Sequence, residues 1–176
     1  MPDAPPLPPA FLARPIAHRA LHGPGRPENS LAAVRAAVAA GYGIEVDVQP
    51  TADGQALVFH DEDAGRLTGA SGPVAARTAA EMARLPLLGG DGAGAPTLPQ
   101  VLAEVAGRVP LLIEVKDQTG TMGETDGALE AAVAAALAGY RGPVAAMSFN
   151  PHAVATLARL LPGIPRGLTT SAYDPR

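Results

Sequence analysis

Short apolar runs and longer alanine- and leucine-rich segments alternate along most of the chain. The apolar runs are rich in β-branched residues and have the length of strands, whereas the alanine-rich segments have the length of helices. We expect strands over residues 14–18, 43–49, 56–61, 110–116, 142–149 and 165–170. Helices are expected over residues 30–41, 76–85, 97–107, 127–140 and 150–161. This alternation predicts an α/β protein with a parallel sheet and right-handed crossovers.

Residues that cap helices support these boundaries. Asn29 or Ser30 can cap the first predicted helix, and Asn150 can cap the last. Thr78 and Thr97 each begin a capping box, Thr-x-x-Glu and Thr-x-x-Gln. Such residues bond the free N–H groups of a first helical turn, so each of these helices has a defined start.

Polar residues interrupt the apolar strands near their carboxyl ends. They are His18, Glu45, Asp47, His60, Glu114, Lys116 and Ser148. Since side chains along a strand alternate between two faces, Glu45 shares a face with Asp47, and Glu114 shares a face with Lys116. In a β/α barrel, the carboxyl ends of the strands carry the active site, so this pattern predicts a site there.

The residue types favour one kind of chemistry. Three carboxylates that converge on one site repel one another, and a hard divalent cation with oxygen ligands, Mg²⁺ or Ca²⁺, offsets that repulsion. Histidines can act as metal ligands or as an acid and a base. Arg19 and Lys116 add positive charge suited to a phosphate. The combination indicates metal-assisted hydrolysis of a phosphoester.

Composition narrows the class of protein. The 176 residues are 47% hydrophobic, which suits one globular domain, and the net charge is −4. The chain has no basic run, which argues against nucleic acid as a partner, and no apolar stretch long enough to form an integral membrane segment. It has no cysteine, which is compatible with the cytoplasm, the location we expect. The proline-rich residues 1–13 predict an extended arm, followed by the domain over residues 14–176.

Five short motifs resemble the glycerophosphodiester phosphodiesterase family in their type and order. They are His18-Arg19, Glu28-Asn29-Ser30, Glu45-Val46-Asp47, Thr51-Ala52-Asp53-Gly54 and His60-Asp61. Farther on, "LPLLIEVK" resembles the family's Glu-x-Lys strand, and "MSFNP" resembles its Ser-Phe strand end. The resemblance covers residues 14–170 and rests on the ordered combination of these motifs.

The resemblance implies a (β/α)₈ TIM barrel of the phospholipase C-like phosphodiesterase type. It implies a divalent metal on Glu45, Asp47 and Glu114, with His18 and His60 as the acid–base pair. We favour His60 as the acid and His18 as the base, although the sequence does not decide between them. Glycerophosphodiesters would be hydrolysed to sn-glycerol 3-phosphate and an alcohol, which places the protein in lipid and glycerol metabolism.

The resemblance also suggests residues that bind the substrate. Arg19 and Lys116 would offset charge on the non-bridging phosphate oxygens. Ser148 is expected as a hydroxyl lining the pocket, and Glu28 is either a pocket residue or a surface residue. Asn29 is interpreted most simply as a helix cap.

The chain departs from the family pattern in two places. Ala20 stands where the family usually has glycine, so we expect a backbone without positive φ there. A β/α barrel needs about 250 residues, and this chain offers six strands, so the barrel is predicted to be truncated at its C-terminal side.

Two other functions therefore remain open. One is a non-catalytic or inactive fragment that binds phosphoesters. The other is a related phospholipase D-like enzyme that forms a cyclic phosphate. The alcohol part of the substrate and the oligomeric state are not determined by the sequence.

Overall fold

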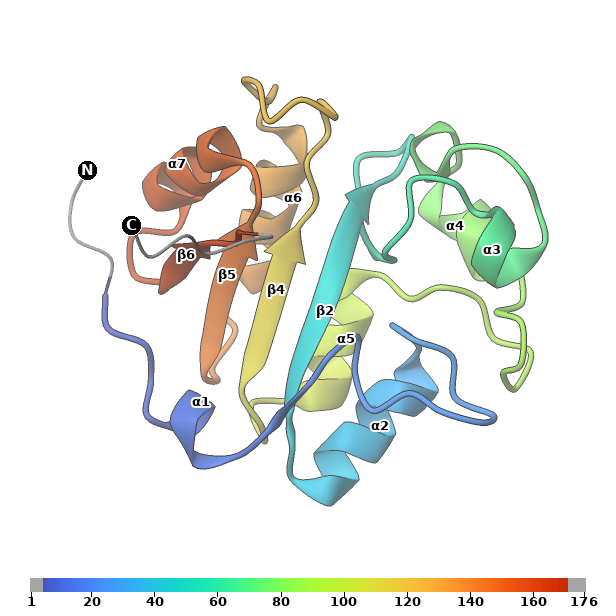
Figure 1. Ribbon diagram of the computed structural model, residues 1–176, viewed down its shortest axis with the longest axis horizontal. Coiled ribbons are helices and arrows are strands. Elements are labelled where there is room, and N and C mark those ends of the chain that lie inside the picture. Colours follow the sequence, from blue (N-terminus) through green and yellow to red (C-terminus); the bar gives the residue numbers. More distant parts are fainter. Residues whose placement is uncertain (1–4, 171–176) are drawn as a thin grey trace.

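A six-stranded sheet forms the centre of the computed structural model, which describes residues 5–170 (Figure 1). The strands are β1 (Ile16–Ala17), β2 (Gly43–Pro50), β3 (Ala56–Val58), β4 (Leu111–Val115), β5 (Val144–Ser148) and β6 (Arg166–Leu168). Strands β1, β2, β4, β5 and β6 are neighbours in that order and run parallel. Strand β3 pairs antiparallel with β2, to which the turn at residues 51–55 connects it. All six predicted strands are confirmed.

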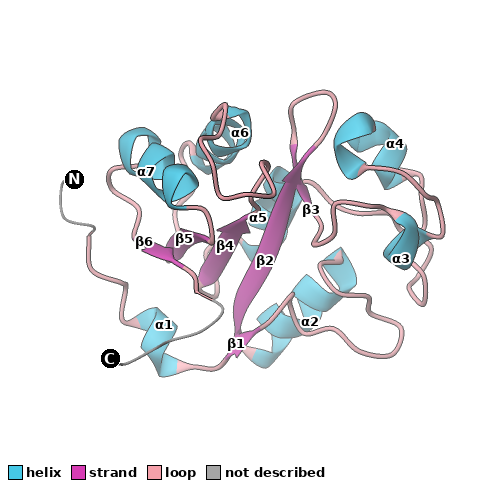
Figure 2. Cartoon of the chain, turned by 45° about the horizontal axis from the view of Figure 1, so that its top comes forward, coloured by secondary structure: helices cyan, strands magenta, loops and turns pink. Residues whose placement is uncertain are grey.

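Apart from the first, the helices lie between strands in the chain (Figure 2). They are α1 (Ala10–Ala13), α2 (Leu31–Ala40), α3 (Gly65–Thr68), α4 (Ala79–Ala83), α5 (Leu98–Val105), α6 (Ala128–Leu137) and α7 (Pro151–Leu160), with a 3₁₀ turn, η1 (Val74–Ala76). The parallel strands follow one another in chain order without reversal. Right-handed crossovers then place the connecting helices on one face of the sheet, as in a β/α barrel and unlike a doubly wound sheet.

Apolar residues of the strands and helices pack into the main core on that face. Ile44, Val46 and Val48 of β2 are completely buried there, together with Val34 of α2 and Val101 of α5. In Figure 1, α5 and α6 lie behind β2 and β4. The intervening residues of the strands therefore point to the opposite face of the sheet, where the polar residues gather.

The predicted caps account for the starts of the helices. Ser30, and not Asn29, caps α2, because its Oγ accepts a hydrogen bond from the N–H of Ala33 at 3.1 Å. Thr78 and Glu81 form the predicted capping box of α4. Asn150 caps α7 by accepting the N–H of His152 at 2.8 Å.

Two single-turn helices were not predicted. The turn α1 lies within the segment that was expected to be extended, and it buries Phe11. The turn α3 belongs to a second, smaller apolar cluster that includes Leu57, Phe59 and Met82. Through this cluster, the segment between β3 and α5 packs together and lies beside the carboxyl end of β2 (Figure 1). Within residues 5–170, no helix is long and apolar enough to cross a bilayer.

Candidate active site

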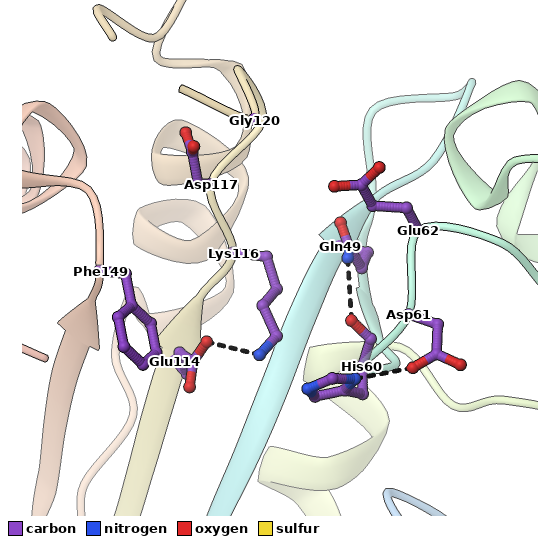
Figure 3. Close-up of a pocket in the computed structure, with 9 residues that line it drawn as sticks. All are labelled: Gln49, His60, Asp61, Glu62, Glu114, Lys116, Asp117, Gly120 and Phe149. Atoms are coloured by element: carbon purple, nitrogen blue, oxygen red, sulfur yellow. Dashed lines mark hydrogen bonds and ion pairs between the residues drawn. The ribbon is translucent and has the colours of Figure 1, made fainter. Parts of the chain in front are cut away.

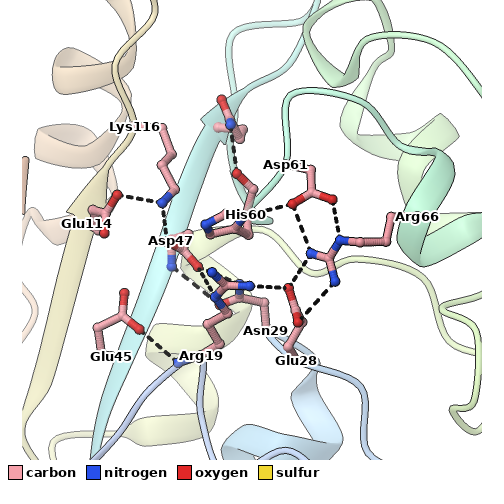
Figure 4. A network of polar contacts seen from close by, with 11 residues as sticks. Arg19, Glu28, Asn29, Glu45, Asp47, His60, Asp61, Arg66, Glu114 and Lys116 are labelled. Atoms are coloured by element: carbon pink, nitrogen blue, oxygen red, sulfur yellow. Dashed lines mark hydrogen bonds and ion pairs between the residues drawn. The ribbon is translucent and has the colours of Figure 1, made fainter. Parts of the chain in front are cut away.

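Three carboxylates converge on the polar face of the sheet (Figure 4). The pairing of β2 with β4 sets Asp47 directly beside Glu114, and Glu45 lies two residues earlier on the same face. One oxygen of each carboxylate lies within 4.8 Å of the others, and all three residues are buried. The alternation predicted from the sequence thus brings the three acids together.

Two positively charged residues contact this carboxylate cluster. Lys116 Nζ lies 2.7 Å from Asp47 Oδ1 and 2.5 Å from Glu114 Oε1. Arg19 donates its backbone N–H to Glu45 Oε2 at 2.8 Å, and its Nε lies 3.7 Å from Asp47 Oδ2. Burial alone would lower the pKa of Lys116, but its hydrogen bonds to Asp47 and Glu114 outweigh burial and raise that pKa. Lys116 is therefore a permanent positive charge at the cluster.

Glu45 is buried, and one of its carboxylate oxygens lacks a hydrogen-bond partner among the described residues. Burial, followed by repulsion from Asp47, raises the pKa of Glu45 to about 7. Its Oε1 is buried and has no hydrogen-bond partner in the described part of the chain. Three clustered carboxylates with one free buried oxygen match the oxygen-rich donor set that Mg²⁺ and Ca²⁺ prefer, so these residues fit a hard divalent cation.

A left-handed turn after β1 brings the backbone to Glu45. Arg19 has φ +54° and Ala20 has φ +63°, so the expectation that Ala20 would avoid positive φ is wrong. The conformation lets the N–H of Arg19 reach the Glu45 carboxylate and the N–H of Ala20 reach the Glu45 carbonyl at 3.0 Å. These bonds offset the strain of a non-glycine residue in this region, which is about 1–2 kcal/mol.

Asn29 holds Asp47 instead of capping a helix. Its Nδ2 donates to Asp47 Oδ2 at 2.8 Å, and its Oδ1 accepts the backbone N–H of Asp47 at 3.3 Å. The residue is buried and has φ +58°, a conformation that asparagine tolerates better than most residues. The interpretation of Asn29 as a cap missed this contact, which orients one of the clustered carboxylates.

His60 faces the cluster from the segment after β3. Its Nδ1 lies 2.7 Å from Asp61 Oδ1, and its backbone carbonyl accepts from Gln49 Nε2 at 3.0 Å. A charged carboxylate at Nδ1 favours the tautomer with the proton on that nitrogen. The other ring nitrogen then points away from Asp61 and into the site (Figure 3).

A cavity of about 480 Å³ opens beside these groups. It is lined by Gln49, His60, Asp61, Glu62, Glu114, Lys116, Asp117, Gly120 and Phe149 (Figure 3). Hydrogen bonds from the backbone of Met122 and Thr119 and from Asn150 outweigh burial and lower the pKa of Asp117 to about 2. Most residues that line the cavity carry polar or charged groups, and the Phe149 ring forms one wall.

The other predicted site residues lie as follows. His18 directly follows β1 and is exposed, and it does not line the cavity. The Glu28 carboxylate accepts from Arg19 Nη1 at 3.0 Å and from Arg66 Nη2 at 2.6 Å, so it contacts arginines and does not line the cavity.

Ser148 is not at the cavity, contrary to the prediction. It is fully buried, its Oγ donates to the Val115 carbonyl at 2.6 Å, and it accepts the N–H of Asn150. The pairing of Glu114 with Met147 puts Met147 on the face of the acids, so Ser148 points to the helices. Its neighbour Phe149 lines the cavity instead.

Three residues of the site network had no functional assignment from the sequence. Asp61 belongs only to a motif of the resemblance, and Asn29 belongs to a motif and is interpreted as a cap. Arg66 had no signal at all, although its guanidinium contacts both Asp61 and Glu28. Its sequence distance from Glu28, 38 residues, hides the contact, whereas the His-Asp motif itself could have indicated Asp61.

A sequentially ordered parallel sheet with acids, lysine and histidine at its carboxyl edge is typical of a β/α-barrel enzyme of phosphoester chemistry. The chain belongs to the glycerophosphoryl diester phosphodiesterase family, whose model matches residues 18–176. The fold is of the TIM-barrel type, as the resemblance implied, and residues 5–170 contain six of its strands.

Individual relatives agree with this membership. The Bacillus subtilis protein "Putative glycerophosphodiester phosphodiesterase YhdW" is 33% identical over 165 residues, which are 88% of this chain and 65% of that protein. A phosphodiesterase from Oleispira antarctica, solved with its product sn-glycerol-3-phosphate, has a TM-score of 0.84 at 28% identity. That match covers 94% of this chain and 70% of the other.

A glycerophosphodiester phosphodiesterase from Agrobacterium tumefaciens gives a TM-score of 0.73 at 30% identity, over 87% of this chain and 65% of the other. The chain thus spans about two thirds of the length of the proteins that it resembles here.

Proposed function

We propose that the protein hydrolyses glycerophosphodiesters to sn-glycerol 3-phosphate and an alcohol, with a divalent cation. The observation that carries this proposal is the carboxylate cluster of Glu45, Asp47 and Glu114, with Lys116 bonded to it and His60 beside it. The product bound to the Oleispira antarctica phosphodiesterase, sn-glycerol-3-phosphate, supports the same product here.

The cation would be held by Glu45, Asp47 and Glu114, and it would supply positive charge to the phosphate oxygens as a Lewis acid. Its identity is Mg²⁺ or Ca²⁺, since both prefer oxygen ligands. Arg19 and Lys116 bind the same non-bridging oxygens through their positive charges. Lys116 would exchange part of its contact with the carboxylates for contact with the phosphate.

His60 and His18 divide the proton transfers. A water attacks phosphorus and passes its proton to His18, while the bond from phosphorus to the alcohol oxygen breaks. His60 gives its proton to that oxygen, so a free alcohol leaves. The contact between His60 Nδ1 and Asp61 supports a role of His60 in proton transfer, because it leaves the second ring nitrogen for the substrate. To act as the acid, the ring carries a proton on both nitrogens before this step.

The proposal extends to Glu28, the domain boundaries, the partner and the location. Glu28 acts on the substrate through Arg19, with which it forms a 3.0 Å ion pair. Residues 14–176 form the phosphodiesterase domain and residues 1–13 the arm that precedes it. The partner is a small molecule of phospholipid breakdown, and the lack of cysteine favours a cytoplasmic location.

Phosphorus NMR of the reaction products tests the proposal. Glycerophosphocholine or glycerophosphoethanolamine, incubated with protein and Mg²⁺ or Ca²⁺, should give the resonance of glycerol 3-phosphate. A cyclic phosphate would favour the phospholipase D-like reaction instead. Unchanged substrate with a protein that melts cooperatively would favour the non-catalytic alternative.

A further inference from the structure

Arg66 joins two carboxylates that each hold a residue of the proposed site (Figure 4). Its Nε and Nη2 donate to Asp61 Oδ2 and Oδ1 at 2.6 and 2.9 Å. Its Nη2 and Nη1 donate to Glu28 Oε1 and Oε2 at 2.6 and 3.2 Å. Both oxygens of each carboxylate are thus bound by one planar guanidinium, the geometry for which arginine is suited.

The two carboxylates lead directly to proposed site residues. Asp61 Oδ1, which accepts from Arg66, also lies 2.7 Å from His60 Nδ1. Glu28 Oε1, which accepts from Arg66, also accepts from Arg19 Nη1 at 3.0 Å. An unbroken chain of contacts therefore runs from His60 through Arg66 to Arg19.

We propose that Arg66 is a positioning residue, which fixes the orientation of His60 through Asp61 and is itself anchored by Glu28. This inference rests on the proposed function, since it assumes that His60 transfers a proton. Two parallel hydrogen bonds allow the Asp61 carboxylate one orientation, so the His60 ring is held with its second nitrogen toward the cavity. A ring that can turn would seldom present that nitrogen to the substrate, and misplacement by about 1 Å can reduce a rate about 100-fold.

The surroundings of Arg66 favour this role over a role in stability. Its side chain is 49% exposed, and exposed ion pairs contribute little to stability. The turn α3 is instead fixed by Leu67, which is buried in the second apolar cluster. The hydrogen bonds that Arg66 donates are the largest influence on the pKa of Asp61, and they help to lower this pKa to about 2. Asp61 therefore remains an anion beside His60 at neutral pH.

The test compares the turnover of Arg66→Ala with that of Arg35→Ala. Arg35 is the matched control, because it is 56% exposed and pairs with Glu104 at 2.8 Å, away from the cluster. We expect Arg66→Ala to lower kcat about 10- to 100-fold with KM changed by less than about threefold. Arg35→Ala should retain the wild-type kcat. Because lysine lacks the forked donors, Arg66→Lys should also lose most of the activity, and it serves if Arg66→Ala does not fold.

A double-mutant cycle with Asp61→Asn identifies the route. If Arg66 acts through Asp61, Arg66→Ala should cost less than about twofold in an Asp61→Asn background. Millimolar guanidinium should partly restore the kcat of Arg66→Ala, but not that of the double variant. The proposal would be overturned if the losses of kcat in the two single variants multiply in the double variant. It would also be overturned by wild-type kcat in Arg66→Ala or Arg66→Lys. Wild-type turnover is measured first in the same assay, so its absence would refute the proposed function, whereas an unaffected variant refutes only the role of Arg66.

Discussion

At the scale of single residues, alternate side chains of one strand have separate tasks. Val46 and Val48 pack into the core, while Glu45 and Asp47 between them form the carboxylate cluster. The same alternation on β4 sets Glu114 among the acids. Buried carboxylates are costly without partners, so the lysine, arginine and asparagine contacts to this cluster are as much a part of the site as the acids.

The first prediction at this scale concerns His60. His60→Ala should lower kcat about 10²- to 10⁴-fold, the usual contribution of one general acid or base. The fold should be retained, because the side chain of His60 is 31% exposed and lies outside both apolar clusters. Steady-state kinetics with His152→Ala as the control measure the effect, since His152 is exposed at the start of α7. Wild-type turnover in His60→Ala would refute the acid–base assignment.

The second prediction concerns the charge of Glu45 in the cation-free protein. Its pKa is 4.5 in the unfolded chain and about 7 in the folded protein. The folded state therefore binds more protons between these values, and stability falls as pH rises through this window, by roughly 3 kcal/mol. Urea unfolding of wild type and Glu45→Gln from pH 4 to pH 8, in chelator, measures it.

Glu45→Gln isolates the contribution of this one group, because glutamine has a similar shape and no charge. The stability of the wild type relative to the variant should decrease from pH 4.5 to pH 7. A saturating cation should remove the decrease in the wild type, since it stabilises the ionised carboxylate. A difference that stays constant with pH would contradict the raised pKa of Glu45.

At the scale of elements, the start of α2 combines a structural residue with one that serves the site. Ser30 caps the helix, whereas the adjacent Asn29 holds Asp47. We expect Ser30→Ala to reduce the free energy of unfolding by about 1 kcal/mol and to leave cation affinity unchanged. Asn29→Gly should instead lower cation affinity about 10- to 100-fold, because glycine keeps the positive φ but removes the amide.

Denaturant unfolding and calorimetric cation titration of both variants separate the two effects. For Asn29→Gly, the free energy of unfolding should change less than the free energy of cation binding. Equal effects of the two substitutions on cation affinity would contradict the assignment of Asn29 to the site.

Much of the element order and part of the site could be predicted from local pattern. The period of two in β2 and β4 is visible in the sequence, so the convergence of Glu45, Asp47 and Glu114 was predictable. The face of Ser148 was not, because it depends on the pairing of β5 with β4. The contact of Arg66 with Glu28 depends on the path of two loops, and the turns α1 and α3 are too short to show a helical period.

At the scale of the whole molecule, the network of charged and polar residues at the site is assembled from four distant segments. These are residues 19–29, 45–49, 60–66 and 114–117. The parallel sheet brings the carboxyl-terminal ends of β2 and β4 to one edge, and the turn after β1 and the segment after β3 approach that edge from the same side (Figure 4). A ligand at the carboxylate cluster would therefore connect β2, β4 and the turn after β1.

The cation dependence of hydrolysis in the wild-type protein tests the central claim most directly. After treatment with chelator, the release of glycerol 3-phosphate is measured as Mg²⁺ or Ca²⁺ is added back. We predict no turnover in excess chelator and a saturable return of activity, with Asp47→Asn requiring a much higher cation concentration. Full turnover of the wild type in excess chelator would contradict the account.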